Sequence, residues 1–286
     1  MGKIVIVGSG PAGCSAALYA ARAGQEVVVI SMGMGALSKA ELIQNYYGFE
    51  EGITGAELYR QGVAGAKAVG AEFITAEVVG LDYTGSLVVQ TTEGDYPADA
   101  VILATGAGRI APKIAGLAEH EGRGVSYCAT CDAFFYRGKT AAVLGSGEYA
   151  LHEVQALLPL AGRVILCTNG EPLTADFPEG VEICTEKLAA VEGEEKVSAL
   201  RLENGELLPV EGLFVALGVA GSAALARKLG APVENGRIVV DEKMQTGIPG
   251  LYAAGDCTGG LLQVCKAVYE GALAATEAIK QIRGKK

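Results

Sequence analysis

The sequence predicts an α/β fold made of two Rossmann-like domains, and three observations support this expectation. Residues 3–31 read as a strand, a glycine turn, an alanine-rich helix and a second strand, and residues 139–168 repeat that order. The first strand is a continuous β-branched run, as expected for a parallel strand that is buried on both faces. A chain of 286 residues, half of them apolar, is long enough to form two hydrophobic cores.

The middle of the chain is predicted from short apolar runs and the turn residues between them. Residues 70–107 contain several such runs, which predict short strands with a hairpin turn at residues 91–94. Residues 197–219 show the same pattern around Asn204-Gly205, a pair that favours a tight hairpin turn.

The end of the chain adds strands, a helix and possible connections between domains. Further strands are expected within residues 236–257, and a closing helix is expected from Gln263 to Ile282. Two stretches that contain glycine and proline, near residues 108–116 and 230–236, are candidate linkers and would permit a hinge.

Charge, cysteine content and the N-terminal residues limit the classes of function. The net charge is −10 and the pI is about 4.9, so nucleic acid is not an expected partner, because phosphate binding requires a basic surface. Seven cysteines without the spacing of a disulfide scaffold indicate a reducing compartment. The first residues show no signal-peptide pattern and no apolar run is long enough to span a bilayer. We therefore expect a cytoplasmic protein without a membrane partner.

The first glycine turn carries a dinucleotide-binding pattern. Gly8, Gly10 and Gly13 follow a strand and open a helix, which is the context in which this spacing binds a pyrophosphate at the helix N-terminus. The second strand ends in Ser31, where an acidic residue would normally bind the ribose. Ribose binding must therefore use a hydroxyl, the backbone or a later residue.

The second glycine turn has the same spacing but lacks the residues that bind a nicotinamide nucleotide. Gly145, Gly147 and Ala150 follow a strand and open a helix. No acidic residue ends the next strand, since Glu171 comes late, and no Arg or Lys cluster is present for a 2′-phosphate. The architecture is expected here, while the binding of NAD(P)H is in doubt.

Two further turns have the composition of cofactor contacts. Thr105 and Gly106 end a strand in residues 100–107, and Gly255 and Asp256 end another in residues 250–260. Asp256 could accept a hydrogen bond from a cofactor hydroxyl. Each turn alone is equally consistent with an ordinary tight turn.

A C-x-x-C pair is the clearest candidate for chemistry. Zinc needs four ligands, but Cys128 and Cys131 have no second such pair, and His120 and His152 are the two histidines of the chain. A structural disulfide is disfavoured by the compartment and by the small loop that it would close. A redox pair remains, in which the adjacent Asp132 could donate or accept a proton.

The order of these segments resembles the low-molecular-weight thioredoxin reductases. The matching segments are GSGPAG, ATGA, GRGVSYCATCDAFFYRGK, GLFVALG and GLYAAGD, which cover almost the whole chain. The resemblance implies two domains of the FAD/NAD(P)-binding type. Residues 1–111 and 236–286 would form a discontinuous FAD-binding domain. Residues 112–235 would form an inserted NAD(P)-binding-like domain that carries the C-x-x-C pair.

The resemblance also implies roles for individual residues. Cys131 resembles the sulfur that faces the flavin, Cys128 the sulfur that attacks the disulfide of thioredoxin, and Asp132 the acid of the family. The residues expected at the FAD are Gly8, Gly10, Pro11, Ala12, Gly13, Ser31, Asn45, Thr105, Gly106, Gly255, Asp256 and Gln263. A homodimer is expected from the resemblance alone.

The electron donor is where the chain departs from NADPH-dependent members. The family's arginine cluster is missing, since no basic residue occurs in residues 168–185, and the same segment is too short for the usual helix. Leu262 stands where an arginine is usual. QNYYGF and GDCTGGLLQVCKAV are more similar to ferredoxin-dependent flavin thioredoxin reductases, which implies reduced ferredoxin as the donor.

An acidic ferredoxin needs a basic surface, and two other functions stay open. Arg109, Lys113, Arg123 and Lys139 are candidates for that surface, although an ordinary solvated surface explains them equally well. One alternative is an NAD(P)H-dependent thioredoxin reductase with an atypical nucleotide pocket. Another is a redox sensor that uses the flavin and the disulfide as a switch.

Overall fold

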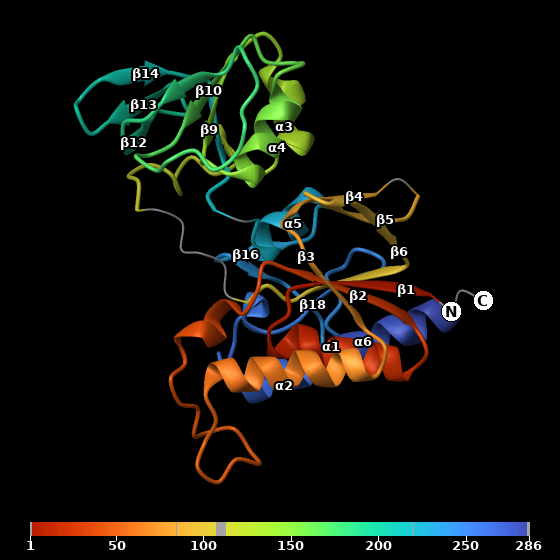
Figure 1. The fold of residues 1–286 in the computed structure, drawn as a ribbon. Coiled ribbons are helices and arrows are strands. Elements are labelled where there is room, and N and C mark those ends of the chain that lie inside the picture. The colour runs from red at the N-terminus through yellow and green to blue at the C-terminus, as the bar shows by residue number, and fades with distance from the viewer. Residues whose placement is uncertain (1, 84, 107–112, 219, 285–286) are drawn as a thin grey trace. The chain divides into compact units, whose positions relative to one another are not determined.

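The computed structural model describes residues 2–83, 85–106, 113–218 and 220–284 (Figure 1). The chain divides into two compact units. One unit is formed by Met1–Arg109 together with Gly221–Lys286, and the other by Ile110–Ala220. Each unit contains one parallel sheet, which confirms the predicted α/β fold with two Rossmann-like domains.

The second predicted domain boundary differs from the structure. It lies between Ala220 and Gly221 rather than between residues 235 and 236. The reason is helix α5 (Ser222–Lys228), which belongs to the first unit. The backbone N–H of Ser222 donates to Thr105 Oγ1 at 2.8 Å, and the two hydroxyls are 2.7 Å apart. The predicted first boundary, between residues 111 and 112, lies outside the described residues.

The first unit is built on a parallel sheet with the order β18-β7-β1-β2-β3. Its strands are β1 (Lys3–Val7), β2 (Glu26–Ser31), β3 (Glu72–Thr75), β7 (Ala100–Leu103) and β18 (Leu251–Ala253). Because all five strands are parallel, their carboxyl ends meet at one edge. Figure 1 shows three helices on one side of this sheet, α1 (Pro11–Arg22), α2 (Gly55–Ala68) and α6 (Val264–Gly284).

Helix α1 begins and ends where its sequence provides the right residues. Pro11 occupies the first helical position, where its fixed φ suits the helix and its missing N–H costs nothing. Gly24, just beyond the end, has a φ of 78°, which a glycine adopts without strain. The alanine-rich face between these ends allows close packing of α1 on the sheet and on α6, and Ala16, Ala17 and Ala20 are fully buried.

Smaller elements complete the first unit. An antiparallel sheet is formed by β4 (Val78–Tyr83), β5 (Leu87–Thr91) and β6 (Gly94–Ala98), and a hairpin by β16 (Val233–Glu234) and β17 (Arg237–Ile238). Two 3₁₀ turns, η1 (Gly35–Lys39) and η3 (Asp256–Thr258), lie near the carboxyl edge. The strands predicted in residues 70–107 and the closing helix are thus confirmed, with α6 extending to Gly284.

The second unit repeats the plan with the parallel order β11-β10-β9-β15-β8. Its strands are β8 (Val125–Ser126), β9 (Thr140–Leu144), β10 (Arg163–Cys167), β11 (Glu182–Cys184) and β15 (Gly212–Val215). An antiparallel sheet contains β12 (Leu188–Glu192), β13 (Ala199–Leu202) and β14 (Leu207–Pro209). The helical segments are α3 (Ala129–Asp132), η2 (Ala133–Tyr136) and α4 (Glu148–Leu157).

Two expectations about the second unit are met by the described residues. Asn204 and Gly205 form the turn between β13 and β14. Residues 168–181, which connect β10 to β11, contain no helix. This connection therefore lies as an irregular segment at the edge of the sheet, next to the second glycine turn.

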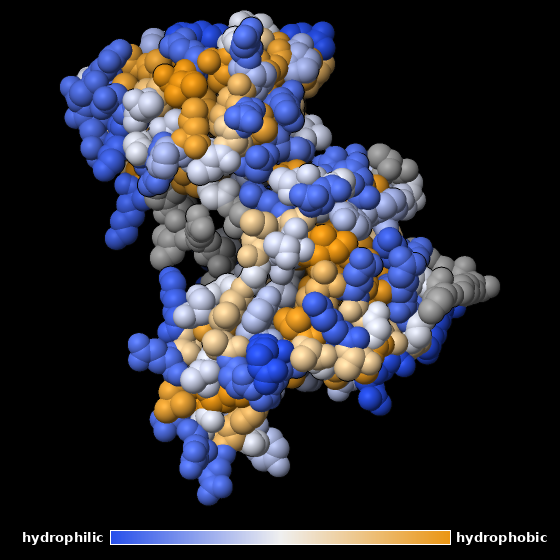
Figure 2. All heavy atoms as spheres, in the orientation of Figure 1, coloured by the Kyte–Doolittle hydropathy of each residue, from blue (hydrophilic) through white to orange (hydrophobic). Residues whose placement is uncertain are grey.

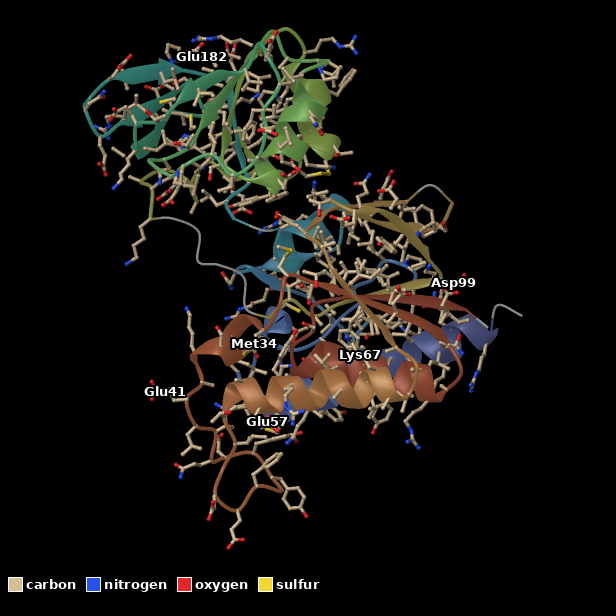
Figure 3. All side chains as sticks on the ribbon, in the orientation of Figure 1. Met34, Glu41, Glu57, Lys67, Asp99 and Glu182 are labelled. Carbon is tan, nitrogen blue, oxygen red and sulfur yellow. A yellow bond between two sulfur atoms is a disulfide. The ribbon has the colours of Figure 1, made fainter. Side chains whose placement is uncertain are left out.

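The surface of the molecule is mixed in polarity. Figure 2 shows hydrophilic residues over most of the visible face, with hydrophobic patches between them. Some of these charged side chains contact the first sheet. Lys3 on β1 forms an ion pair with Glu26 on β2 at 3.0 Å. The backbone N–H of Lys3 also donates to the carboxylate of Asp99, which is labelled in Figure 3, at 2.8 Å. Within the part of the chain that the structure describes, we find no helix that meets the length and hydrophobicity of a membrane span.

Candidate active site

The turn between β1 and α1 contains two glycines that are required by the packing of strand and helix and one that faces open space. A Cβ on Gly8, whose φ is 110°, would lie 2.4 Å from the carbonyl oxygen of Ala104, and a Cβ on Gly13 would lie 1.8 Å from that of Gly8. Both contacts are impossible, so these glycines bring strand and helix together. A Cβ on Gly10 would meet no heavy atom within 4 Å. The open space at Gly10 is where a ligand can approach the backbone.

The start of α1 suits a negatively charged ligand. No side chain caps the first turn, which contains Pro11, Ala12 and Gly13. Uncapped N–H groups and the helix dipole favour an anion at this position. The open turn therefore fits the pyrophosphate of a dinucleotide, as the sequence predicts.

Serines occupy the position where an acidic residue usually binds ribose. Ser31, at the end of β2, lies with its hydroxyl 2.7 Å from that of the buried Ser9. Ser9 Oγ also lies 3.1 Å from the hydroxyl of Tyr59 and donates to the carbonyl of Gly33 at 3.2 Å. The result is a cluster of neutral hydroxyls beside the glycine turn, with Ser31 partly exposed at its edge.

Two predicted cofactor contacts that are far apart in sequence lie together. Asn45 Nδ2 donates to Gln263 Oε1 at 2.8 Å, and both amides are exposed. The neighbouring Tyr46 stacks on Phe49 with ring centres 6.0 Å apart, whereas Tyr47 is 98% exposed. The pairing brings the loop after η1 to the start of α6, which begins at Val264.

The loop of Gly255 and Asp256 is held by charges that the sequence analysis did not identify. Glu270 Oε2 accepts the N–H of Gly255 at 2.8 Å and lies 3.0 Å from Lys266 Nζ. Lys266 Nζ also donates to the carbonyls of Gly255 at 2.8 Å and Gly259 at 2.6 Å. This largely buried ion pair fixes the backbone that carries Asp256, whose own carbonyl accepts a hydrogen bond from Arg237.

The remaining predicted turn also lies at the carboxyl edge of the first sheet. Thr105 follows β7 and hydrogen-bonds to Ser222, and Gly106 has a φ of 76° with no heavy atom near its Cβ position. Together, the turns after β1, β2, β7 and β18 place the predicted contacts at one edge of a single sheet. The structure thus brings them into one region of the first unit.

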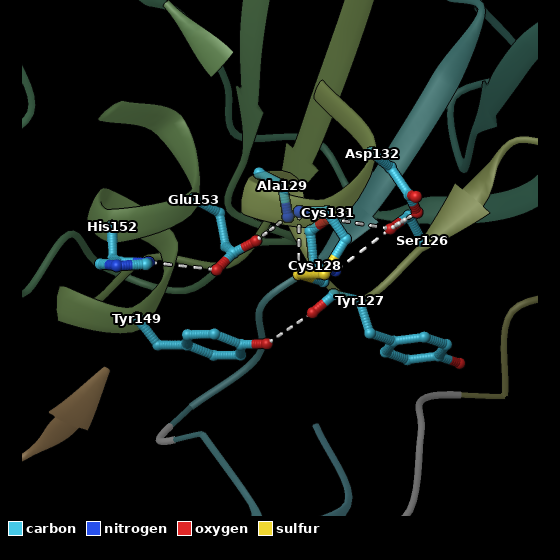
Figure 4. The surroundings of a disulfide bond; sticks show 9 residues. All are labelled: Ser126, Tyr127, Cys128, Ala129, Cys131, Asp132, Tyr149, His152 and Glu153. Carbon is cyan, nitrogen blue, oxygen red and sulfur yellow. Dashed lines mark hydrogen bonds and ion pairs between the residues drawn. A yellow bond between two sulfur atoms is a disulfide. The ribbon is translucent and has the colours of Figure 1, made fainter. Parts of the chain in front are cut away.

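The cysteine pair lies in the second unit, at the start of α3 (Figure 4). Cys128 and Cys131 form a disulfide, and the N–H of Cys131 also donates to Cys128 Sγ at 3.1 Å. Cys128 is buried, with 4% of its surface exposed, whereas Cys131 is exposed. Asp132 Oδ2 accepts a hydrogen bond of 2.6 Å from the hydroxyl of Ser126. The predicted acid is therefore within a short hydrogen-bonded network of the disulfide.

A second carboxylate beside the disulfide was missed by the sequence analysis. Glu153, on α4, is 1% exposed, and its Oε2 accepts the N–H of Ala129, the residue after Cys128 (Figure 4). Its other oxygen, Oε1, lies 3.2 Å from His152 Nδ1. A signal existed in the sequence, because Glu153 lies on the apolar face of α4 with Tyr149, Ala150 and Leu157.

Exposed aromatic side chains follow helix α3 directly. Phe134 and Phe135 are 66% and 67% exposed and lie edge to face, with ring centres 6.3 Å apart. Arg137 lies over the ring of Phe134 at 5.3 Å. The surface next to the disulfide is therefore apolar with a positive charge at its margin.

The second glycine turn differs from the first in the space it leaves. A Cβ on Gly147 would lie 3.0 Å from Thr174 Oγ1, and the N–H of Thr174 donates to the carbonyl of Ser146 at 2.8 Å. Glu148 occupies the first turn of α4, and an open hollow beside it is lined by Thr174, Asp176 and apolar residues. The segment after β10 thus lies against the turn at the place where the first turn is open.

Three of the four basic candidates are described, and all three are exposed. Arg123 donates to the carbonyl of Glu119, and Lys139 lies 5.9 Å from the ring centre of Tyr136. The fourth candidate, Arg109, lies outside the described residues.

Comparison with known proteins gives consistent results. The pyridine nucleotide-disulphide oxidoreductase family matches residues 2–271. The thioredoxin reductase of Aquifex aeolicus is 35% identical over 99% of this chain and 94% of its own length. An atypical thioredoxin reductase from Desulfovibrio vulgaris Hildenborough is 40% identical, with 99% of each chain covered and a TM-score of 0.93. A ferredoxin-flavin thioredoxin reductase from Clostridium acetobutylicum is 35% identical, covers 99% of this chain and 98% of its own, and has a TM-score of 0.75.

These matches agree with the geometry of both units. The first unit has an open glycine turn that fits a dinucleotide pyrophosphate, and the second carries a disulfide between neighbouring cysteines. The chain therefore belongs to the pyridine nucleotide-disulphide oxidoreductase family and, within it, to the low-molecular-weight thioredoxin reductases, which are FAD-binding flavoproteins.

Proposed function

We propose that this thioredoxin reductase takes its electrons from reduced ferredoxin and transfers them, through FAD and the Cys128–Cys131 pair, to the disulfide of thioredoxin. FAD, when bound, can accept electrons singly from an iron–sulfur donor and pass them as a pair to a disulfide. The residues that would hold it are those at the carboxyl edge of the first sheet, above all Gly10, Asn45, Asp256 and Gln263. This assignment rests on their convergence at one edge and on the family's use of FAD.

The cysteines would divide the chemistry between them. Two electrons and two protons convert the disulfide into two thiols, with Cys131 as the exposed sulfur that receives the electrons. Cys128 would then attack the disulfide of thioredoxin, and Cys131 would displace reduced thioredoxin from the mixed disulfide. Cys128 is buried, so this role requires that its sulfur become accessible before the attack. Asp132, hydrogen-bonded to Ser126, is the group available to hold a proton during these steps.

The observation that carries the choice of donor is the second glycine turn. Thr174 lies against Gly147, in the space that a pyrophosphate would need. In addition, residues 164–186 contain five carboxylates and no basic residue, and Glu148 adds a further negative charge at the start of α4. Phosphate groups would be repelled at this place rather than bound. The similarity to a ferredoxin-flavin thioredoxin reductase supports the same choice.

Surfaces for both protein partners support the proposal. Phe134 and Phe135 offer an exposed apolar patch beside the disulfide, which suits docking of thioredoxin. Lys113, Arg123 and Lys139 offer exposed positive charge in the second unit, which suits an acidic ferredoxin.

The donor can be tested directly under anaerobic conditions. The oxidised holoenzyme is mixed with NADPH, with NADH or with reduced ferredoxin, and the flavin absorbance is followed in a stopped-flow instrument. We expect rapid bleaching with ferredoxin and little with either nucleotide, followed by the appearance of thiols on added thioredoxin. Rapid bleaching by NADPH would establish the alternative donor. If none of the three donors supports reduction of thioredoxin, the alternative function as a redox sensor would be favoured.

The basic surface and the oligomeric state need separate measurements. Replacing Lys113, Arg123 or Lys139 with Glu is expected to raise KM for ferredoxin and leave KM for thioredoxin unchanged, because steering depends on opposite charge. Lys243→Glu, at an exposed position of the first unit, is the matched control. We also propose a homodimer, for which light scattering should give twice the chain mass of 29.2 kDa.

A further inference from the structure

A second pair of cysteines lies at the edge of the parallel sheet in the second unit. Cys167 ends β10 and Cys184 ends β11, and the two are register partners in neighbouring parallel strands. Their side chains therefore project from the same face of the sheet as register neighbours. Neighbouring strands are about 4.8 Å apart, and disulfides span Cα distances of about 4.4–6.8 Å. The pair is thus within reach of a covalent bond.

The two thiols are in unequal surroundings. Cys167 is completely buried, whereas Cys184 is partly exposed on an edge strand. The interaction between the two neighbouring thiols lowers the pKa of Cys184 to about 6 and raises the pKa of Cys167. By contrast, burial raises the pKa of Cys14 to about 12 and that of Cys257 to about 11. Cys184 is therefore mainly a thiolate at neutral pH, with a protonated thiol in contact with it.

The charges around the pair select what can react there. Glu186 and Glu206 lie near Cys184, and Glu182 lies near Cys167. Glu182, labelled in Figure 3, accepts hydrogen bonds from Nε and Nη2 of Arg163 across the strands, at 2.6–3.0 Å. Carboxylates around a thiolate disfavour an anionic reagent such as glutathione disulfide, and they leave access for a small uncharged oxidant. The described residues contain no cluster of three metal-ligating side chains, so a metal site does not compete with this interpretation.

We propose that Cys184 and Cys167 form a second redox-active thiol pair, which a small uncharged hydroperoxide oxidises to a disulfide. The Cys184 thiolate attacks one peroxide oxygen, the O–O bond breaks, and a Cys184 sulfenic acid and hydroxide (or alkoxide) form. The Cys167 thiol then attacks the sulfenic sulfur, forms the S–S bond and releases water. The net reaction oxidises two thiols by two electrons and reduces one peroxide to water and an alcohol, or to two waters with hydrogen peroxide.

The pair is independent of the route that electrons take through the flavin. Neither thiol belongs to the Cys128–Cys131 disulfide, and the peroxide supplies the oxidising equivalents. The inference therefore holds whichever donor reduces the enzyme. Its experiment needs no donor and no thioredoxin, so its failure is separable from a failure of the proposed function.

Peptide mapping of the holoenzyme tests the proposal. Trypsin cleaves after Arg163 and Lys187, so both cysteines lie in one peptide, residues 164–187. The protein, with Cys128–Cys131 oxidised, is treated with hydrogen peroxide, alkylated and digested. We expect this peptide to lose two hydrogens and to regain both thiols after treatment with dithiothreitol. In Cys167→Ser, or in Cys167→Ala if the first variant folds poorly, the peptide should instead gain one oxygen at Cys184 and react with dimedone.

The exposed Cys265 provides an internal control in the same sample. A thiol of pKa about 6 is about 30 times more ionised at pH 7 than an ordinary thiol, and its lower nucleophilicity offsets about tenfold of this. Cys184 should therefore react up to about threefold faster than an exposed thiol of ordinary reactivity. Cys184→Ser should abolish disulfide formation, and Cys265→Ser should not affect it. Two unmodified thiols in the 164–187 peptide after Cys265 has been oxidised would overturn the proposal.

Discussion

Two glycines of the first turn should respond oppositely to the same added methyl group. Gly10 has φ and ψ of −69° and −172°, which any residue adopts, and its Cβ position meets no heavy atom within 4 Å. At Gly13, the same methyl would lie 1.8 Å from the carbonyl oxygen of Gly8. We therefore predict that Gly10→Ala folds but binds FAD weakly, whereas Gly13→Ala is destabilised with or without FAD.

The expected magnitudes follow from these contacts. Gly10→Ala should leave the stability of the apoprotein unchanged or raise it by about 0.4–1 kcal/mol, because alanine restricts the unfolded chain. Against a bound pyrophosphate, the methyl group should cost about 1–3 kcal/mol, equivalent to about 5–150-fold in Kd. Gly13→Ala must displace backbone by more than 1 Å, so we expect a loss of about 3 kcal/mol or more, a large share of a typical stability of about 5–15 kcal/mol.

Apoprotein prepared from both variants separates the two effects. Thermal unfolding without flavin measures the cost to the fold, and titration with FAD, followed by flavin fluorescence, measures affinity. Wild-type affinity in Gly10→Ala would refute the assignment of this turn to the pyrophosphate. A wild-type Tm in Gly13→Ala would refute the close strand–helix contact.

Three further predictions concern the groups that hold the site. Glu153→Gln should raise the reduction potential of the Cys128–Cys131 disulfide by about 30–60 mV, because the reduced form no longer places a thiolate beside a buried carboxylate. Equilibration with a glutathione buffer measures this potential. An unchanged potential would contradict the prediction. Cys131→Ser should accumulate a mixed disulfide between Cys128 and thioredoxin on a non-reducing gel, and accumulation in Cys128→Ser instead would reverse the assigned roles. Lys266→Met should lower the free energy of unfolding by about 3 kcal/mol in a denaturant titration and lower the flavin content, since it leaves a buried carboxylate without its partner. The matched control Lys280→Met, at an exposed ion pair, should change the free energy of unfolding by less than about 1 kcal/mol.

Local patterns predicted much of the fold because they depend on neighbouring residues. The spacing of Gly8, Gly10 and Gly13 after an apolar strand determines a strand, a turn and a helix irrespective of the rest of the chain. The hairpin at Asn204 and Gly205 likewise depends on two adjacent residues. Such features were confirmed in the structure at the predicted positions.

Features that depend on distant partners could not be predicted in the same way. The boundary near residue 220 depends on Ser222 meeting Thr105, which is 117 positions earlier. The burial of Cys128 and the exposure of Cys131 depend on how α3 packs against α4, and the C-x-x-C spacing does not encode it. Glu153 is intermediate: a carboxylate on an apolar helix face indicated a buried partner, but not which N–H it would bind.

The two glycine turns show why the same sequence motif can bind a nucleotide in one unit and not in another. Both turns have the same backbone plan, a strand, three small residues and a helix, and the first glycine is packed against backbone in each. The middle glycine differs, because Gly10 is open while Gly147 faces Thr174. The difference arises outside the motif, in the segment that follows the strand after each helix, β2 in the first unit and β10 in the second. After β10 this segment is short, acidic and hydrogen-bonded to Ser146. It therefore fills the space where a pyrophosphate would bind and, like the pyrophosphate, is negatively charged. In the second unit the glycine turn therefore serves the packing of sheet and helix, and the space and charge beside the middle glycine determine whether a nucleotide can bind.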